Sequence, residues 1–158
     1  PRRRQLLGQI GLQNFEVLSP AADETYDRAL TPDEIVAELS RRKAEAAAAL
    51  VDDANAVLIA ADTMVFLDDL RLGKPRSEDE AFRMLSALSG RTHQVRTGVT
   101  VVRGGQFVTR VETSDVTFRP LTAGEIRAYI RTGDPMDKAG AYGVQGKAAL
   151  FVEGIRGE

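Results

Sequence analysis

The sequence LIAADT at residues 58–63 is a short apolar run that ends in a carboxylate and a hydroxyl group. Such a run predicts a strand, with Asp62 where the strand leaves the core, a place where α/β folds hold ligands. Further along, Gly73-Lys74-Pro75 predicts a stiffened loop that presents an ammonium group. Together these charges suit a phosphate held with a metal ion. Considered alone, Asp62 is equally a turn-capping aspartate, and Lys74 is an ordinary surface lysine.

Composition limits the classes of protein to which the chain can belong. Its 158 residues correspond to about one domain. The 21 basic residues are balanced by 23 acidic ones, which argues against binding to long nucleic acid. Cysteine is absent, so a disulfide framework, a thiolate metal site and a cysteine nucleophile are excluded. No membrane helix or secretory signal is predicted, and a cytoplasmic location is expected.

Three expected helices begin with the same pattern, a hydroxyl residue followed by glutamate three positions later. In this capping box the two side chains satisfy each other's free backbone donors at the start of the helix. The pairs are Thr31 with Glu34, Ser77 with Glu80, and Thr122 with Glu125. They predict helices over about 32–51, 78–89 and 123–132, and a further short helix is predicted over about 3–10.

Segments rich in valine, threonine and phenylalanine predict the strands of a sheet. Strands are expected over about 15–18, 57–67, 94–102, 106–118 and 149–152. Gly104-Gly105 predicts a tight hairpin, because both residues adopt positive φ without strain, and Asp68-Asp69 predicts a second hairpin. Strands that alternate with helices, together with hairpins, predict a mixed α/β (α+β) domain with a partly antiparallel sheet.

Several other charged residues are candidates for a phosphate site, although each has an ordinary interpretation as well. Residues 1–4, PRRR, lie at the start of a predicted helix, where free N–H groups and arginine side chains favour an anion. Glu24 is a loop acid that could bind a hard cation together with Asp62. Lys43 lies on the long predicted helix. Taken singly, the arginines, Glu24 and Lys43 are better explained as solvated surface charges.

Residues 134–146, DPMDKAGAYGVQG, are denser in turn-forming residues than any other part of the chain. Such a segment between a helix and a strand favours a shaped binding loop over a plain connector, which remains the alternative. The amide of Gln145 can both donate to and accept from the edge of a nucleobase. His93 is the one histidine, and because no Ser/His/Asp arrangement surrounds it, a structural role is expected.

In order along the chain, these segments resemble the Maf family, the septum-formation-inhibitor-like nucleoside triphosphate pyrophosphatases. Each motif is weak alone, whereas the ordered combination is specific. The matching pieces are PRR at 1–3, DET at 23–25, RKA at 42–44, ADT at 61–63, GKP at 73–75, SGRTHQV at 89–95, TGV at 97–99 and DKAGAYGVQG at 137–146.

The resemblance implies a fold like that of inosine triphosphate pyrophosphatases, with a long mixed twisted sheet, two lobes and a nucleotide in the central cleft. It also implies hydrolysis between the α and β phosphates, with a divalent metal, usually Mg²⁺ and alternatively Mn²⁺. By position, Asp62 would activate water, Glu24 and Asp62 would hold the metal, and Arg3, Lys43 and Lys74 would bind the triphosphate. Such charges are needed because the substrate brings about four negative charges.

Three positions are associated with substrate choice in this family, and here they are Arg2, Thr63 and Gln145. This combination resembles the subgroup that acts on dTTP and UTP, whereas the subgroup that acts on 7-methyl-GTP has an aromatic residue, Gln and Glu. Gln145 matches a carbonyl and an N–H of thymine or uracil. Modified pyrimidine triphosphates, such as 5-methyl-UTP or pseudo-UTP, remain alternatives.

Two family motifs, Ala-Ser-x-Ser before Pro-Arg and a closing Asn-Val-x-Gly-Leu-Pro, are absent from the sequence. We therefore expect residues 1–158 to be one domain trimmed at both ends. The resemblance also makes a homodimer an open expectation. Two alternative functions remain, a nucleotide-sensing inhibitor of septum formation that acts through a protein partner, and an RNA binder of similar fold, which the balanced charge disfavours.

Overall fold

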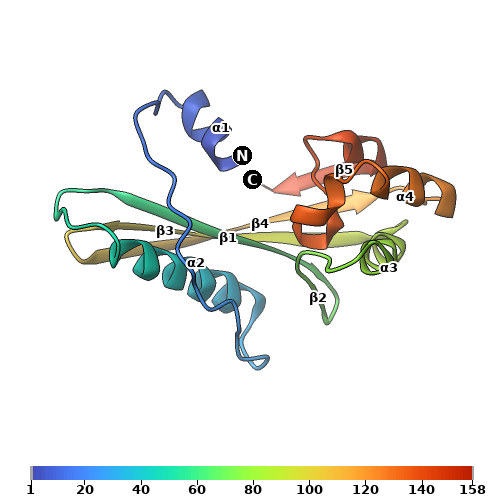
Figure 1. Cartoon of the computed structure of the whole chain (residues 1–158). Coiled ribbons are helices and arrows are strands. Elements are labelled where there is room, and N and C mark those ends of the chain that lie inside the picture. Colours follow the sequence, from blue (N-terminus) through green and yellow to red (C-terminus); the bar gives the residue numbers. More distant parts are fainter. Residues whose placement is uncertain (1, 158) are drawn as a thin grey trace.

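The computed structural model describes residues 2–157 of the chain. The strands in this part, which lie between residues 58 and 157, form one five-stranded sheet (Figure 1). Pro1, part of the predicted anion-binding N-terminus, lies outside these residues. The strands lie in the order β2-β1-β3-β4-β5, and every neighbouring pair is antiparallel. They are β1 (Leu58–Leu67), β2 (Leu70–Leu72), β3 (Thr92–Arg103), β4 (Gln106–Phe118) and β5 (Val152–Gly157).

Four α-helices and three short 3₁₀ helices accompany the sheet. The α-helices are α1 (Arg2–Gln9), α2 (Pro32–Ala48), α3 (Glu78–Leu88) and α4 (Ala123–Ile130). The 3₁₀ helices are η1 (Asp134–Asp137), η2 (Ala139–Ala141) and η3 (Lys147–Phe151). The predicted α/β class is confirmed, but the described strands form no parallel pair, so the expected mixed sheet is antiparallel over this part of the chain. Within residues 2–157, no helix is long and apolar enough to cross a membrane.

The predicted helix starts are confirmed, and two of them have complete capping boxes. Thr31 and Thr122 each accept a hydrogen bond from the backbone N–H of the glutamate three positions later, and that glutamate bonds back to the cap. At α3 only half of the box forms. Ser77 accepts from the backbone of Glu80, but the Glu80 carboxylate binds Arg76 instead. The α2 and α4 helices end two or three residues before the predicted ends.

Both predicted hairpins form, whereas two of the predicted strands are wrong in part or in whole. Gly104 and Gly105 join β3 to β4 with positive φ angles of 54° and 76°, and Asp68, with φ 49°, joins β1 to β2. Residues 15–18 form no strand, because they pair with no other segment and Val17 is largely exposed. Residues 149–151 belong to η3, which turns Phe151 into the core before β5 begins at Val152.

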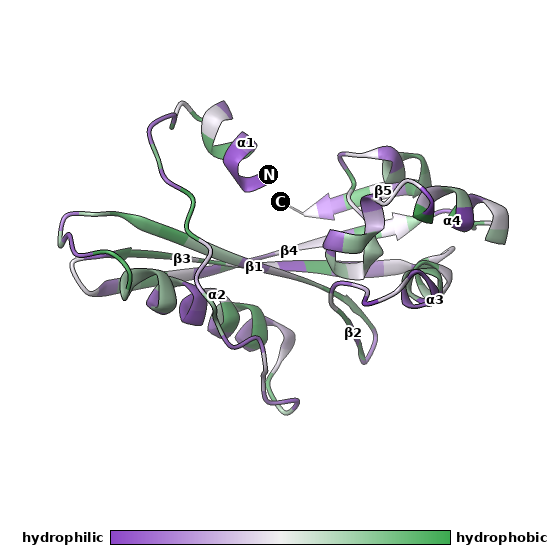
Figure 2. Ribbon diagram, viewed as in Figure 1, coloured by the Kyte–Doolittle hydropathy of each residue, from purple (hydrophilic) through white to green (hydrophobic). Residues whose placement is uncertain are grey.

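Opposite faces of the sheet are covered by different helices, which gives the molecule two apolar clusters. On one face, Ile35, Val36 and Leu39 of α2 pack against Met64 and Phe66 of β1. Figure 2 shows the apolar and polar residues that alternate along α2, as expected for a helix with one buried side. These contacts define the first of the two expected lobes.

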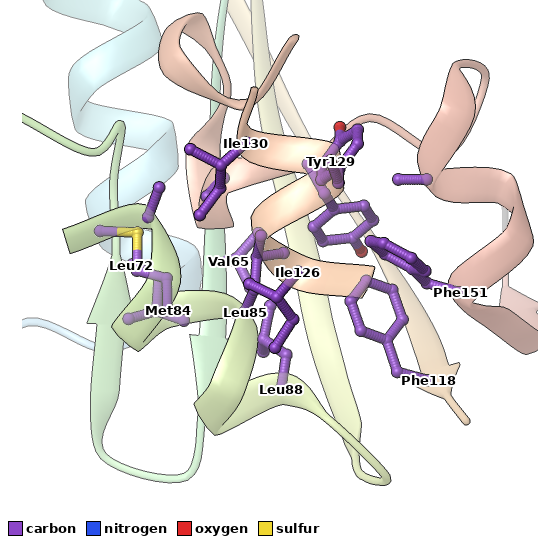
Figure 3. Packing of buried hydrophobic residues seen from close by; sticks show 14 of the residues in the cluster. Val65, Leu72, Met84, Leu85, Leu88, Phe118, Ile126, Tyr129, Ile130 and Phe151 are labelled. Carbon is purple, nitrogen blue, oxygen red and sulfur yellow. The ribbon is translucent and has the colours of Figure 1, made fainter. Parts of the chain in front are cut away.

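The larger cluster lies on the other face and gathers α3, α4 and the 3₁₀ helices. Val65 and Leu67 of β1 point into it, because successive strand residues point to opposite faces. Phe118, Tyr129 and Phe151 meet there edge to face (Figure 3). The strand β1 therefore contributes side chains to both clusters. Asp62 precedes these packed residues along the strand.

Candidate active site

The floor of the candidate site is the place where α2 crosses the sheet at unusually short range. Gly98 pairs with Asp62 across β3 and β1. A Cβ atom on Gly98 would lie 2.1 Å from the carbonyl oxygen of Val36, so only glycine permits this approach of helix and sheet. Further along α2, Ser40 hydrogen-bonds to Thr100 with 2.8 Å between the hydroxyl oxygens. These contacts fix α2 on the face of the sheet to which Asp62 points.

Lys43, one helical turn beyond Ser40, places its ammonium group between two carboxylates. Its Nζ atom contacts Oδ1 of Asp62 and lies 2.9 Å from Oε1 of Glu24. Asp62 is buried, with 8% of its surface exposed, whereas Glu24 is largely exposed. Glu24, Lys43 and Asp62, which are far apart in the sequence, therefore meet as predicted.

A short polar turn holds Glu24 in this position. The carboxylate of Asp23 accepts hydrogen bonds from the backbone N–H and the hydroxyl group of Thr25, both at 2.8 Å. Arg42 of α2 donates to the carbonyl oxygen of Thr25. The segment that carries Glu24 is thereby tied to the same helix as Lys43.

The opposite charges of Lys43 and the two carboxylates favour the charged forms of Lys43 and Glu24. Burial alone would lower the pKa of Lys43, but its hydrogen bonds to Asp62 and Glu24 outweigh burial and raise the pKa. The hydrogen bond from Lys43 lowers the pKa of Glu24, and the nearby charge of Lys74 lowers it further. Lys43 and Glu24 are therefore both charged at neutral pH, and Lys74 lies close enough to act on the same site.

Lys74 is exposed and, within residues 2–157, has no hydrogen-bond or ion-pair partner. Its loop is held from the other side, because the N–H of Gly140 donates to the carbonyl of Gly73 at 3.0 Å. The charge of Lys74 is thus available for a ligand, and its backbone is fixed by the segment that leads to Gln145.

The N-terminal arginines do not join this group of charges. Figure 1 shows α1 on the opposite side of the sheet from α2, beyond a long irregular segment. Arg2 hydrogen-bonds to Gln5 within α1, with 2.9 Å between Nη1 and Oε1, and Arg3 is exposed. The expected convergence of Arg3 with Glu24, Lys43, Asp62 and Lys74 is therefore wrong for this conformation, because α1 buries no residue that would anchor it to the sheet.

The other two residues predicted to govern substrate choice lie away from the Asp62 carboxylate. Thr63 follows Asp62 on β1 and so points to the other face, where its hydroxyl lies 2.9 Å from that of Thr97. Gln145 is exposed on a turn closed by a hydrogen bond from Gly146 N–H to the Gly143 carbonyl. That segment packs over the Thr63 face of β1, because Gly140 lies against Val65.

A divalent metal is implied by the resemblance, and the residues present fit such an ion. Glu24 and Asp62 both contact one positive charge, the Lys43 ammonium, so their oxygens already surround a cation. Residues 2–157 hold no cluster of three or more acidic or histidine side chains suited to a metal. Two carboxylates are nevertheless what Mg²⁺ commonly takes from a protein when substrate phosphates complete its coordination.

Sequence reasoning missed the residues that hold the loop before Gln145. Tyr129 donates a hydrogen bond to Asp134 over 2.7 Å, and Lys138 donates to both Asp134 and Asp137. Asp134 was expected as part of a shaped loop, and Asp137 and Lys138 as part of that loop and of the family motif at 137–146, with no role assigned to any of the three. A tyrosine in the last turn of α4, with Asp134-Pro135 beginning five residues later, was the available signal for this network.

The fold and this site together define an α/β protein with a charged site on one strand of its sheet. The whole chain, residues 1–158, matches the family model described as Maf-like protein. The chain therefore belongs to the Maf-like protein family.

Relatives of known name are similar along the whole chain. One from Thermococcus gammatolerans is 48% identical over 158 residues, which cover 100% of this chain and 82% of the relative. One from Halalkalibacterium halodurans is 47% identical over 158 residues with the same coverage. One from Moorella thermoacetica is 50% identical over 161 residues, covering 100% of this chain and 81% of the relative. Each of the three is named dTTP/UTP pyrophosphatase.

Proposed function

We propose that this protein is a nucleoside triphosphate pyrophosphatase that cleaves dTTP and UTP to the monophosphate and pyrophosphate. The observation that carries the proposal is the meeting of Lys43 with both Glu24 and Asp62, beside the charge of Lys74. The names of relatives at 47–50% identity support the same activity and substrates.

Asp62 is the proposed general base, because it is a buried carboxylate on a rigid strand. Its strand and Gly98 fix its position, and Lys43 holds one of its oxygens. A positioned base that takes the proton from an attacking water contributes about 10²–10⁴-fold to the rate. Lys43 and Lys74 would bind the triphosphate oxygens, since their charges offset the repulsion that otherwise opposes attack.

Glu24 and Asp62 would hold the divalent metal, most simply Mg²⁺. The metal, when bound, supplies charge that stabilises the phosphate oxygens. Glu24 suits this role because its lowered pKa keeps the carboxylate ionised. Arg3 would bind the triphosphate after a movement of α1 towards the site, since α1 lies on the opposite side of the sheet from α2.

The proposal is tested by pyrophosphate release from dTTP with Mg²⁺, measured for the wild type and for Asp62→Asn. We expect Asp62→Asn to lower kcat at least about a hundredfold with a smaller change in KM, since the base acts in the transition state. The matched control is Asp115→Asn, a half-buried aspartate on β4 that hydrogen-bonds to Gln94.

Two results would contradict this assignment. Unchanged turnover in Asp62→Asn removes Asp62 from the mechanism. Binding of dTTP by the wild type without any pyrophosphate release favours the alternative, a nucleotide sensor that acts on septum formation through a partner.

A further inference from the structure

Gln145 depends on its backbone for its position, because its side chain is exposed and has no hydrogen-bond partner within the described residues. It occupies the third position of the turn Gly143–Gly146, which is closed by a 3.0 Å hydrogen bond. An open hollow of about 540 Å³ borders this turn at Gly146. The contacts that hold Gly143 and Gly146 therefore fix the backbone from which the Gln145 side chain extends.

Gly143 and Gly146 both rest on a partly buried polar network beneath the turn, in which Tyr129 is buried and Asp134 and Lys138 are half-buried. A Cβ on Gly143 would lie 2.8 Å from Cδ of Lys138, and one on Gly146 would lie 3.1 Å from Oδ2 of Asp134. The Gly143 N–H also donates to the hydroxyl of Tyr129 at 3.4 Å. The turn is thus seated on Lys138, Asp134 and Tyr129.

The residues of this network are held by several contacts of their own. The Tyr129 hydroxyl donates to Oδ2 of Asp134 at 2.7 Å, and its ring packs edge to face on Phe151 with 5.2 Å between the ring centres (Figure 3). The ammonium of Lys138 donates to the carbonyl of Asp134 at 2.7 Å, to its Oδ1 at 3.0 Å, and to Asp137 at 2.7 Å. Hydrogen bonds from Tyr129 and Lys138 lower the pKa of Asp134, outweighing its burial, so Asp134 remains an ionised acceptor.

We infer that Tyr129, Asp134 and Lys138 are positioning residues that set the base preference of the enzyme by fixing the turn that carries Gln145. The inference rests on the proposed function and on base reading by Gln145, which the family resemblance implies; an unchanged ratio of dTTP to GTP in Gln145→Ala would overturn it. The contacts of Tyr129 and Asp134 described above are with the turn and its support, and none is with Asp62, Lys43 or Glu24. Their loss should therefore alter discrimination between bases more than the phosphate chemistry.

The first test compares kcat/KM for dTTP, UTP, CTP and GTP in the wild type and in Tyr129→Phe. Phenylalanine keeps the packing on Phe151 and removes the hydroxyl. We expect the ratio of dTTP to GTP to fall about tenfold, within the range that small misplacements of a binding group cause, through a higher KM for dTTP. Turnover of the poorly bound triphosphates should change little.

A second variant perturbs the same turn and leaves Tyr129 unchanged. Gly143→Ala should push the Lys138 chain aside, and because Gly143 has no positive φ, alanine fits its backbone. We expect the same fall in discrimination. The control is Thr100→Val, which removes a buried hydroxyl bonded to Ser40 and Thr109. Because that contact holds α2, the variant should lower the melting temperature and reduce turnover of all four triphosphates by the same factor, so the ratio should not change.

A double-mutant cycle separates positioning from general damage. If Tyr129 acts through Gln145, Tyr129→Phe should no longer change the ratio once Gln145→Ala is present. The inference is overturned if Tyr129→Phe changes the ratio of dTTP to GTP as much in the Gln145→Ala background as in the wild type. It is also overturned if the wild type prefers dTTP to GTP and neither Tyr129→Phe nor Gly143→Ala changes that preference. Absence of pyrophosphate release in the wild type instead defeats the proposed function itself.

Discussion

At the scale of single residues, the buried aromatic group around His93 ties the 134–151 segment to the sheet. His93 Nε2 lies 2.7 Å from the Tyr142 hydroxyl, and both rings pack against Phe118. Burial lowers the pKa of His93 to about 4, although the carbonyl of Arg91 opposes this shift. The structural role predicted from the sequence fits this environment, which lies on the opposite face of the sheet from Asp62.

This pKa makes a prediction about stability. His93 is neutral in both states well above pH 6.5, but as the pH falls through 6.5 the unfolded chain binds a proton that the folded chain does not. The free energy of unfolding should therefore decrease by about 2 kcal/mol between pH 7 and pH 5. Urea unfolding at both pH values measures this change, and His93→Gln should show a flatter dependence, since His93 is the one histidine. Equal slopes for the two proteins would contradict the prediction.

At the scale of elements, the contact between α2 and β3 at Gly98 governs the site. Alanine there would place a Cβ against the main chain of Val36, which cannot move without shifting the helix. We expect Gly98→Ala to lower the free energy of unfolding by at least about 1–3 kcal/mol and to reduce activity, because Lys43 moves with α2. Chemical denaturation and the dTTP assay measure the two effects.

Gly154→Ala is the matched control for that substitution. Gly154 lies on β5, where an added Cβ would meet no atom within 4 Å, and its φ is not positive, so alanine should be tolerated. Similar stability for Gly98→Ala and Gly154→Ala would show that the helix can withdraw from the sheet at little cost.

The elements also show where local sequence was sufficient and where it was not. Capping boxes and turn glycines act between near neighbours, so the starts of α2 and α4 and the β3–β4 hairpin followed directly from the sequence. The segment 15–18 has the composition of a strand but lacks a pairing partner, and composition cannot supply one. The same holds for η3, where burial of Phe151 overrides the local preference for an extended chain.

At the scale of the whole molecule, the meeting of Glu24, Lys43 and Asp62 was expected from the family resemblance, not from spacing along the chain. Three separate elements bring them together, and the TGV motif at 97–99 marked Gly98 without indicating the close approach of helix and sheet that decides the geometry. The position of α1 was missed for a similar reason, because an amphipathic pattern is needed to anchor a helix and α1 buries none of its residues.

Binding of a triphosphate should stabilise the molecule as a whole. We expect an uncleavable analogue of dTTP with Mg²⁺ to raise the melting temperature, corresponding to about 2.7 kcal/mol at a concentration one hundred times its Kd. The increase should largely disappear with EDTA, since Glu24 and Asp62 are the proposed metal ligands. An equal increase with and without the metal would argue against that role. Differential scanning fluorimetry measures both.

The alternation of side chains along β1 has a consequence for how such proteins diversify. Asp62 lies on one face and Thr63 on the other, so the proposed general base and a residue proposed to govern substrate choice occupy separate surfaces of one strand. With these proposed roles, substitutions on the Thr63 side would change which nucleotide is accepted and would leave the Asp62 side of the strand unaltered. A single-residue insertion in this strand, by contrast, would exchange the two surfaces and destroy both traits at once.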